Sequence, residues 1–159
     1  VIEVAPVIID GKVISSTLIR KALFDGKIDL ANKYLGRDFF ITGKIIPGNK
    51  LGTKLGFPTA NISIEDSNKI IPGIGVYAVT VMYKDNYYNG MLYIGYRPTI
   101  KGRNLSVEVH IFNFNQNIYY ETITVFFKHF IRSEKFFPSI DELQKQLNKD
   151  KIIAIRMLK

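Results

Sequence analysis

Short segments rich in β-branched and aromatic residues follow one another from Arg37 to Ile131, with no helical pattern between them. Turn signals such as Lys84-Asp85-Asn86 and Asn115-Gln116-Asn117 separate these segments. Five or six short strands in this arrangement favour an antiparallel sheet closed into a barrel, because closure removes exposed strand edges. The predicted strands are Phe39 to Ile46, Gly75 to Tyr83, Tyr88 to Tyr96, Asn104 to Phe114 and Glu121 to Ile131.

The segment before the predicted barrel has a different character. The pattern from Val1 to Val13 predicts a short hairpin. A serine N-cap within Ser15-Ser16-Thr17 then starts a helix that Gly26 is placed to end. Asp29 is predicted to cap a second short helix, with Gly36 just after its end.

A last helix is predicted after the strands. Ser139 to Glu142 has the sequence of a capping box, in which the serine reaches forward and the glutamate reaches back. Because apolar residues recur on one face, we expect this helix to cover the barrel. That face consists of Ile140, Leu143, Leu147 and Ala154, with Gln144, Lys145 and Lys149 on the outside.

The composition narrows the classes of partner. Lysine and arginine number 22 against 14 acidic residues, and this excess favours nucleic acid, an anionic membrane or phosphorylated small molecules. The absence of cysteine excludes disulfides and thiolate metal sites. With no long apolar run and no signal peptide, we expect a soluble, cytoplasmic protein without a membrane partner. The first residue is Val1 rather than Met, which suggests a piece of a longer protein.

The stretch from Gly48 to Asn61 contains the first candidate site. Glycines recur at a spacing of four, at Gly48, Gly52 and Gly56, and lysines such as Lys54 lie between them. Glycine lets another group approach the backbone closely, and lysines supply donors and positive charge for phosphate. The spacing matches neither the P-loop nor the dinucleotide-binding pattern, so a plain surface turn remains an alternative.

A Pro-Thr-Ala-Asn box closes this stretch. Pro58 favours an extended backbone, in which Thr59 and Asn61 project to the same side. A hydroxyl oxygen and a carboxamide oxygen are neutral, hard ligands that suit a Mg²⁺ ion carrying substrate phosphates. A proline followed by threonine also commonly starts an ordinary strand, and this alternative stays open.

The second candidate site lies on the predicted strand from Leu105 to Phe112. Its two-residue period places Val107, Val109 and Ile111 on one face and Glu108, His110 and Phe112 on the other. A carboxylate within reach of a substrate hydroxyl can accept its proton during attack, as a kinase requires. A solvated outer face would show the same pattern. Taken together, Lys54, Thr59, Asn61 and Glu108 supply the parts of a phosphoryl-transfer site.

Five motifs occur in order between Arg37 and Asp150, namely L-G-T-K-L-G-F-P-T-A-N-I, P-G-I-G-V-Y-A-V, I-G-Y-R-P-T, V-E-V-H-I-F-N-F and F-I-R-S-E-K-F. Their sequences and their order resemble the riboflavin kinase family. The resemblance implies a mainly β fold, a six-stranded, antiparallel, Greek-key-like barrel with a C-terminal helix, preceded by a short helical segment. It also implies conversion of riboflavin and ATP to FMN and ADP with Mg²⁺.

The resemblance implies roles for individual residues as well. Glu108 is the base that activates the ribityl 5′-hydroxyl, and Thr59 and Asn61 hold Mg²⁺ and the ATP phosphates. The loop from Gly48 to Gly56 is a flap over ATP. The implied ATP-binding residues are Gly48, Gly52, Thr53, Lys54, Gly56, Thr59 and Asn61. The implied flavin-binding residues are Arg132, Glu134 and Phe136.

The run I-S-S-T-L-I-R from Ile14 to Arg20 resembles the end of the adenylyltransferase module of bifunctional bacterial FAD synthetases. Ser15, Ser16 and Arg20 match nucleotide-contacting positions of that module. Residues 1–36 are then the end of this module and a linker, and residues 37–159 are the kinase domain. The sequence lacks the module's His-bearing phosphate motif, so we expect no FMN adenylylation by this chain alone.

Three residues depart from the family pattern, and two other functions remain as alternatives. Thr53 replaces a frequent arginine, Tyr93 a frequent asparagine and Tyr120 a frequent glycine. A charge of +8 with nine Tyr and eleven Phe also suits a nucleic-acid-binding barrel without enzymatic activity. A flavin-binding barrel without transferase activity is the second alternative. The resemblance favours riboflavin or FMN and ATP or ADP as partners, without nucleic acid.

Overall fold

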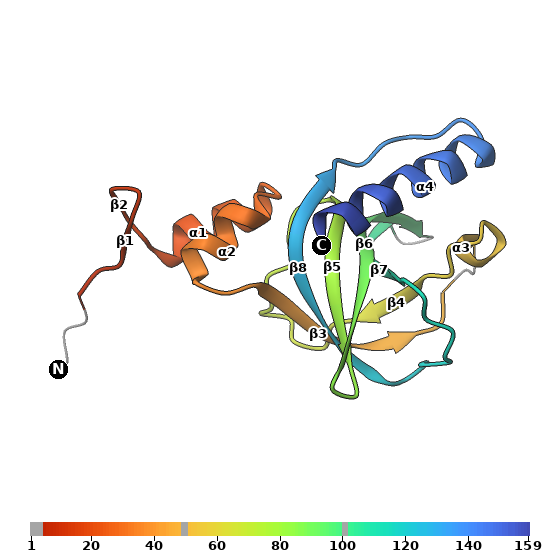
Figure 1. The fold of residues 1–159 in the computed structure, drawn as a ribbon, viewed down its shortest axis with the longest axis horizontal. Helices are drawn as coiled ribbons and strands as arrows, with labels where there is room; N and C mark the ends of the chain where they lie inside the picture. Colours follow the sequence, from red (N-terminus) through yellow and green to blue (C-terminus); the bar gives the residue numbers. More distant parts are fainter. Residues whose placement is uncertain (1–4, 49–50, 100–101) are drawn as a thin grey trace.

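The computed structural model describes residues 5–48, 51–99 and 102–159. Its six long strands are β3 (Phe39–Ile46), β4 (Ala60–Ser63), β5 (Gly75–Tyr83), β6 (Asn86–Thr99), β7 (Gly102–Ile111) and β8 (Thr122–Arg132). They form a closed barrel in the order β3-β4-β7-β6-β5-β8, and neighbouring strands are antiparallel (Figure 1). The predicted six-stranded antiparallel barrel is confirmed.

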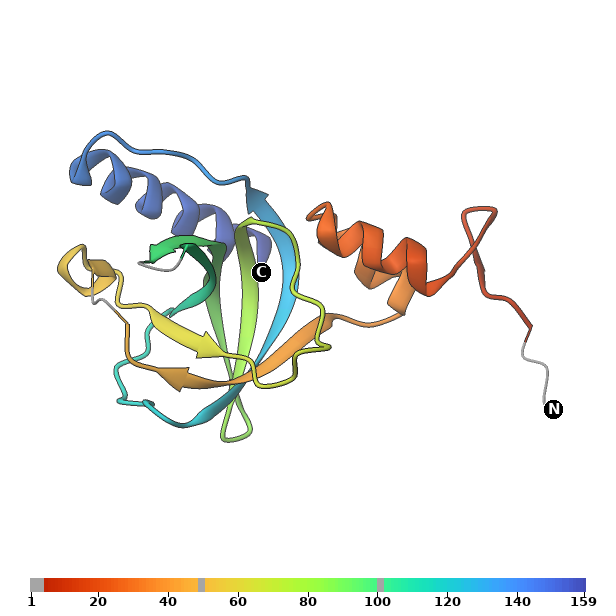
Figure 2. The same ribbon diagram turned by 180° about the vertical axis from the view of Figure 1, so that it is seen from behind.

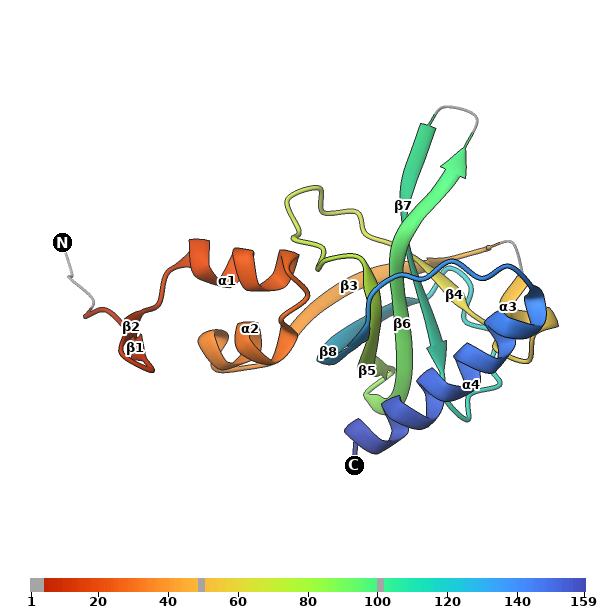
Figure 3. The same cartoon turned by 90° about the horizontal axis from the view of Figure 1, so that it is seen from above.

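The predicted strand boundaries agree with the structure to within three residues at each end. The strand predicted to end at Phe114 ends at Ile111, so Phe112 lies just beyond it. β3 and β5 begin and end as predicted, whereas β6 continues to Thr99 and its pairing with β7 starts at Gly102. The hairpin of β6 and β7 therefore projects beyond the barrel (Figure 3). The short strand β4 begins directly after Thr59 and lies between β3 and β7, so the box starts a barrel strand.

The main core lies inside the barrel. Val107, Val109 and Ile111 of β7 are buried within it, as the two-residue period predicts. Tyr77 and Phe127, the largest fully buried side chains, meet edge to face with ring centroids 5.2 Å apart. Since every second residue of β7 faces inward, Glu108 and His110 face the outside of the barrel wall.

Two helices, α1 (Ser16–Phe24) and α2 (Ile28–Leu35), pack against one side of the barrel (Figures 1 and 2). The carbonyl oxygen of Leu23 accepts a hydrogen bond from Gly73 N at 2.9 Å. The Asn32 side chain donates to the carbonyl oxygen of Phe127 and accepts from Phe39 N, both at 2.8 Å. Buried residues of both helices share one core cluster with the barrel, and these are Ala22, Leu23, Ile28 and Ala31.

The first helix is capped as predicted, whereas the predicted cap of the second is wrong. Ser15 accepts a hydrogen bond from Leu18 N, and Gly36 adopts a φ of 67° at the end of α2. α2 begins one residue before Asp29, so this carboxylate lies in the first helical turn instead. There Asp29 contacts His129 Nδ1 at 2.6 Å and ties the helix to β8. A short hairpin of β1 (Ile8–Ile9) and β2 (Lys12–Val13) precedes α1.

The packing of α1 predicts that the helical segment stabilises the barrel. Leu23 is only 1% exposed, so Leu23→Ala should lower the free energy of unfolding by about 2–5 kcal/mol. Lys21→Ala, on the exposed side of the same helix, should change it by less than about 0.5 kcal/mol. Urea denaturation followed by circular dichroism measures both values. Equal effects of the two substitutions would show that α1 is an independent appendage.

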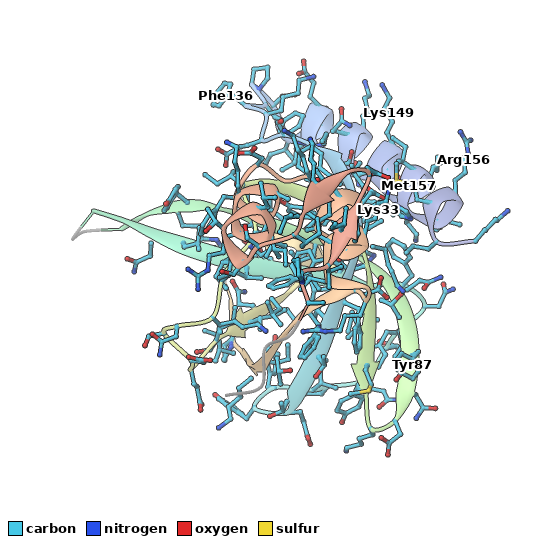
Figure 4. The ribbon with its side chains drawn as sticks, turned by 90° about the vertical axis from the view of Figure 1, so that its left-hand side faces the viewer. Lys33, Tyr87, Phe136, Lys149, Arg156 and Met157 are labelled. Carbon is cyan, nitrogen blue, oxygen red and sulfur yellow. The ribbon has the colours of Figure 1, made fainter. Side chains whose placement is uncertain are left out.

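The C-terminal helix α4 (Ile140–Met157) covers the outer face of the barrel wall (Figure 1). Ser139 caps it by accepting a hydrogen bond from Glu142 N at 3.2 Å, as predicted. Leu143, Leu147 and Ala154 pack in a cluster with Met91 and Phe112 of the barrel side. Lys149 and Arg156 point away from the barrel (Figure 4).

One residue of α4 differs from the predicted pattern. Ile140, predicted on the apolar face, is 61% exposed at the start of the helix. Gln144 is exposed as predicted, and its side chain also donates to the carbonyl oxygen of Leu55 at 3.1 Å. Within the described residues, no helix combines the length and the hydrophobicity that crossing a bilayer requires.

Candidate active site

A cavity of about 350 Å³ lies between the outer face of the barrel and α4. Its apolar wall includes Val76, Met91, Leu92, Phe137, Leu143 and Leu147. Its polar lining includes Thr59, Tyr93, Arg97, Glu108, Arg132 and Glu134. The outer face of β7 is therefore covered and carries a mixed apolar and charged site, which excludes the solvated-face alternative for Glu108.

Four polar side chains form a connected cluster beside this cavity. Thr59 Oγ1 donates to Glu108 Oε2 at 3.3 Å, and Ser106 Oγ lies 3.1 Å from Glu108 Oε1. Ser106 Oγ is also 3.4 Å from Asn61 Oδ1. The two neutral oxygens predicted as metal ligands and the predicted base thus lie together, although Asn61 reaches the cluster through Ser106.

The strand register explains why residues so distant in sequence meet. Asn61 of β4 lies directly opposite Glu108 of β7 in the antiparallel pair. Cross-strand partners place their side chains on the same face of a sheet, so both project outward. Ser106 lies two residues before Glu108 on the same strand and shares this face. Thr59, two residues before Asn61, completes the group.

Two of the predicted glycines allow the chain to pass close to this cluster. A Cβ atom at Gly48 would lie 1.9 Å from Asn61 Nδ2, and one at Gly52 would lie 2.2 Å from the carbonyl oxygen of Phe57. The Cβ at Gly52 would also lie 3.1 Å from Thr59 Oγ1. Larger residues at these positions would displace Asn61 and the chain at Phe57 and Thr59, so this stretch packs directly against the cluster.

The rest of the predicted flap contains a short helix that the sequence pattern did not predict. This helix, α3 (Leu51–Lys54), is followed by Gly56 with a φ of 78°. Thr53 is exposed, and the side chain of Lys54 lies outside the described part of the structure. The predicted contacts of Thr53, Lys54 and Gly56 with ATP stay predictions.

Arg97 of β6 forms an ion pair with Glu108 through Oε1 of the carboxylate. The side chain of Glu108 is 11% exposed and that of Arg97 is 34% exposed, so the pair is largely shielded from water. A carboxylate in such a place needs a partner, since burial of an unpaired charge is costly. Arg97 supplies that partner for Glu108.

His110 holds the backbone next to Thr59 in place. It is 7% exposed, and its Nδ1 donates to the carbonyl oxygen of Pro58 at 2.8 Å, directly before Thr59. Burial lowers the pKa of His110, which favours the neutral ring at neutral pH. The neutral ring holds the start of β4 without adding positive charge beside the cluster.

A second cavity of about 400 Å³ lies on the other side of Thr59. Thr59 lines both cavities and stands between them. The apolar wall of the second cavity includes Ile45, Val109, Ile111 and Phe114. Asn115, Gln116 and Asn117 also line this cavity. The sequence pattern identified these amides only as a turn.

The comparison with known families agrees with this site. The profile described as Flavokinase: Riboflavin kinase matches residues 35–158, which is most of the chain. The chain belongs to the riboflavin kinase family. This result confirms the resemblance found in the sequence and does not favour the nucleic-acid-binding alternative.

Relatives of the family support the same assignment. A bifunctional riboflavin kinase/FMN adenylyltransferase of Haemophilus influenzae is 47% identical over 143 residues, covering 89% of this chain and 46% of the relative. A protein of the same description from Bacillus subtilis is 45% identical over 148 residues, covering 91% of this chain and 46% of the relative. The chain thus spans about half the length of the curated relatives it matches.

Solved structures support the fold. A crystal structure described as a macrolide-efflux protein from Streptococcus pneumoniae matches with a TM-score of 0.88 and 38% identity. The match covers 95% of this chain and 49% of that protein. Riboflavin kinase from Trypanosoma brucei matches with a TM-score of 0.52 and 24% identity, covering 75% of this chain and 78% of the other.

The residues that the family resemblance assigned to the flavin lie in different positions. Arg132 lines the cavity under α4, where Asp150 holds its guanidinium through three contacts of 2.8–3.0 Å. Glu134 also lines the cavity. Phe136 is 86% exposed and points away from the protein (Figure 4), whereas Phe137 lines the cavity in its place.

Several residues of the site were missed from the sequence. Ser106 has a usable signal, because it shares the outward face of its strand with Glu108. Asp150 is fully buried on the inner side of α4, where a lone carboxylate among helix charges gives no warning of burial. Arg97 lies in the I-G-Y-R-P-T motif but was given no role there, and Phe137 has no local signal, since only the fold brings it to the cavity.

Proposed function

We propose that this chain transfers the γ-phosphoryl group of ATP to the ribityl 5′-hydroxyl of riboflavin, forming FMN and ADP. The convergence of Glu108, Thr59 and Asn61 beside one cavity is the observation that carries this proposal. A shielded carboxylate supplies a base, and the two neutral oxygens supply ligands for the metal of a triphosphate. Membership of the family supports this choice of substrates.

The cavity under α4 is the proposed riboflavin site. Its volume of about 350 Å³ lies in the range of small-molecule sites, and its wall is mainly apolar. Leu143 and Leu147 from α4 would face one side of a flat ring, and Met91 of β6 would face the other. A ribityl chain that extends from this ring toward Glu108 brings its 5′-hydroxyl to the base.

The second cavity is the proposed nucleotide site. Ile45, Val109 and Phe114 offer an apolar surface for a base, and the neighbouring amides offer hydrogen bonds to its edge. Because Thr59 lines both cavities, phosphates directed toward Thr59 lie next to Glu108. The two substrates would therefore approach the polar cluster from opposite sides.

The donor set of the cluster fits a magnesium ion. Thr59 Oγ1 and Asn61 Oδ1 are hard, neutral oxygens, and substrate phosphates would complete the shell. When bound, the ion would neutralise charge that develops on the phosphates. Glu108 accepts the proton of the ribityl 5′-hydroxyl. The hydroxyl oxygen then forms a bond to the γ-phosphorus, while the bond between the γ-phosphorus and the ADP oxygen breaks.

Incubation of this chain with riboflavin and Mg-ATP tests the proposal. We expect FMN and ADP to form in a one-to-one ratio, measured by chromatography, and neither to form without riboflavin. FMN should accumulate without FAD, because the sequence lacks the His-bearing phosphate motif of the adenylyltransferase module. Its two histidines lie elsewhere: His110 Nδ1 bonds to the carbonyl oxygen of Pro58, and His129 Nδ1 bonds to Asp29. Absence of FMN with folded protein would contradict the proposal. A reaction that consumes ATP in this way is expected in the cytoplasm.

Tyr93 is expected to hold the loop that follows β8 over the proposed flavin site, through its contact with Glu134. Its hydroxyl contacts the carboxylate of Glu134, and burial followed by this contact raises the pKa of Tyr93, so the hydroxyl keeps its proton. Tyr93→Phe removes one hydrogen bond and should weaken riboflavin binding by about 3- to 10-fold. Quenching of riboflavin fluorescence measures the change.

Tyr87→Phe is the matched control for this substitution, because Tyr87 is 64% exposed and does not line the proposed riboflavin site. It should leave riboflavin affinity unchanged. Equal affinity of the Tyr93 variant and the unsubstituted chain would show that the contact with Glu134 does not help to hold the flavin.

A further inference from the structure

The two carboxylate oxygens of Glu108 have different surroundings. Oε1 forms the ion pair with Arg97 and also lies 3.1 Å from Ser106 Oγ. Among the described side chains, the one hydrogen-bond partner of Oε2 is Thr59 Oγ1, at 3.3 Å. The Thr59 hydroxyl can rotate away from Oε2. The planar guanidinium of Arg97 is held more rigidly and keeps its contact with Oε1. One oxygen is therefore anchored and the other is available.

The anchor is built on rigid elements. Arg97 lies on β6, and Ser106 and Glu108 lie on β7, within one continuous antiparallel pair. Gly95 lies directly opposite Ser106 in this pair, and Arg97 lies opposite Asn104. Side chains on paired strands hold a site more closely than side chains on loops. A carboxylate anchored from this pair keeps its rotamer when a substrate approaches.

From this asymmetry, and resting on the proposed function, we infer that Arg97 and Ser106 are positioning residues for the phosphoryl transfer. They hold Oε1 of Glu108 and so direct Oε2 toward the attacking hydroxyl. The hydroxyl proton passes to Oε2, its oxygen bonds to the γ-phosphorus, and ADP leaves with the electrons of the broken bond. Arg97 keeps its protons throughout and acts on the reaction only through Glu108.

This role makes the effect of Arg97 depend on Glu108. In the unsubstituted chain, Arg97→Gln should lower kcat by about 10- to 100-fold, since a base misplaced by about 1 Å loses rate on that order. Ser106→Ala removes the weaker anchor and should have a smaller effect in the same direction. The dissociation constant for Mg-ADP should change by less than about 2-fold, because neither residue lines the proposed nucleotide site.

A double-substitution cycle tests this dependence. In a Glu108→Gln background, Arg97→Gln should lower the residual single-turnover rate by less than about 3-fold, because the group it positions is already lost. With Glu108 intact, Arg97→Lys should keep a higher kcat than Arg97→Gln, since lysine retains the positive charge but not the planar guanidinium. Arg156→Gln, which removes the same charge from the exposed end of α4, should leave kcat unchanged (Figure 4).

The outcomes separate this inference from the proposed function. If Arg97→Gln has its full effect in the Glu108→Gln background, Arg97 acts directly on the transferred group and the inference is wrong. If Arg97→Gln weakens Mg-ADP binding as much as it lowers kcat, Arg97 is a nucleotide ligand and the inference is also wrong. If Glu108→Gln itself keeps full turnover, the proposed base is wrong. If the Arg97→Gln protein does not fold, the same cycle is measured with Ser106→Ala, a smaller change that also removes a contact with Oε1 of Glu108.

Discussion

Glu108→Gln should lower the kcat for FMN formation by about 10²- to 10⁴-fold, which is the usual contribution of a general base. Glutamine keeps the size and most of the hydrogen bonds of glutamate but cannot accept the hydroxyl proton at neutral pH. Glu108 is the only carboxylate in contact with Thr59 among the described side chains, so no neighbour there replaces it. The loss should therefore appear in the chemical step.

Binding measurements distinguish this explanation from a disrupted site. The dissociation constants for riboflavin and Mg-ADP should stay within about 3-fold of the unsubstituted values, because a base contributes mainly in the transition state. Glu65→Gln removes a carboxylate from an exposed loop and serves as the matched control. Unchanged turnover in the Glu108 variant, or loss of riboflavin binding equal to the loss of kcat, would contradict its role as the base.

Asn61→Ala should weaken Mg-ADP binding by about 10- to 100-fold, the range typical of groups that hold or orient a metal. The side chain of Asn61 is held between Gly48 and Ser106, so its oxygen is directed before any ligand arrives. Alanine removes the oxygen and leaves Thr59 as the remaining neutral ligand of the box. Riboflavin affinity should change by less than about 3-fold, because Asn61 does not line the cavity under α4.

Calorimetric titration of each ligand separately measures this difference. Asn148→Ala on the exposed side of α4 removes a carboxamide from another part of the surface and should affect neither ligand. Titration of Mg²⁺ at fixed ADP should show a higher metal requirement in the Asn61 variant. Equal weakening of nucleotide and flavin would indicate a general disturbance of the barrel and would rule out a specific metal role.

The sequence predicted most of this fold because its signals are local. The two-residue period from Val107 to Ile111 distinguishes the inner face of β7 from its outer face. The capping serines at Ser15 and Ser139 started helices where expected. The error at Asp29 arose because an acidic residue in the first turn of a helix resembles a cap, although its partner is His129 on β8.

The site was predictable to the extent that its residues belong to one motif or one strand. Thr59 and Asn61 share the box, and Glu108 and His110 share a strand, so alternation alone gives their relative directions. Phe136 and Phe137 are adjacent aromatics in an irregular loop, and no periodicity distinguishes the one that turns inward. The short helix α3 was not predicted because it has only four residues and one of them, Gly52, weakens a helical pattern.

By itself, the sequence determined the barrel, the flanking helices and the chemical character of the two motifs. Only the tertiary structure decided that β4 pairs with β7, that Arg97 anchors one oxygen of Glu108, and that α4 covers the site. The physical reason is range: hydrogen bonding and side-chain alternation act between near neighbours, whereas pairing across 47 residues, from Asn61 to Glu108, depends on how the whole barrel closes.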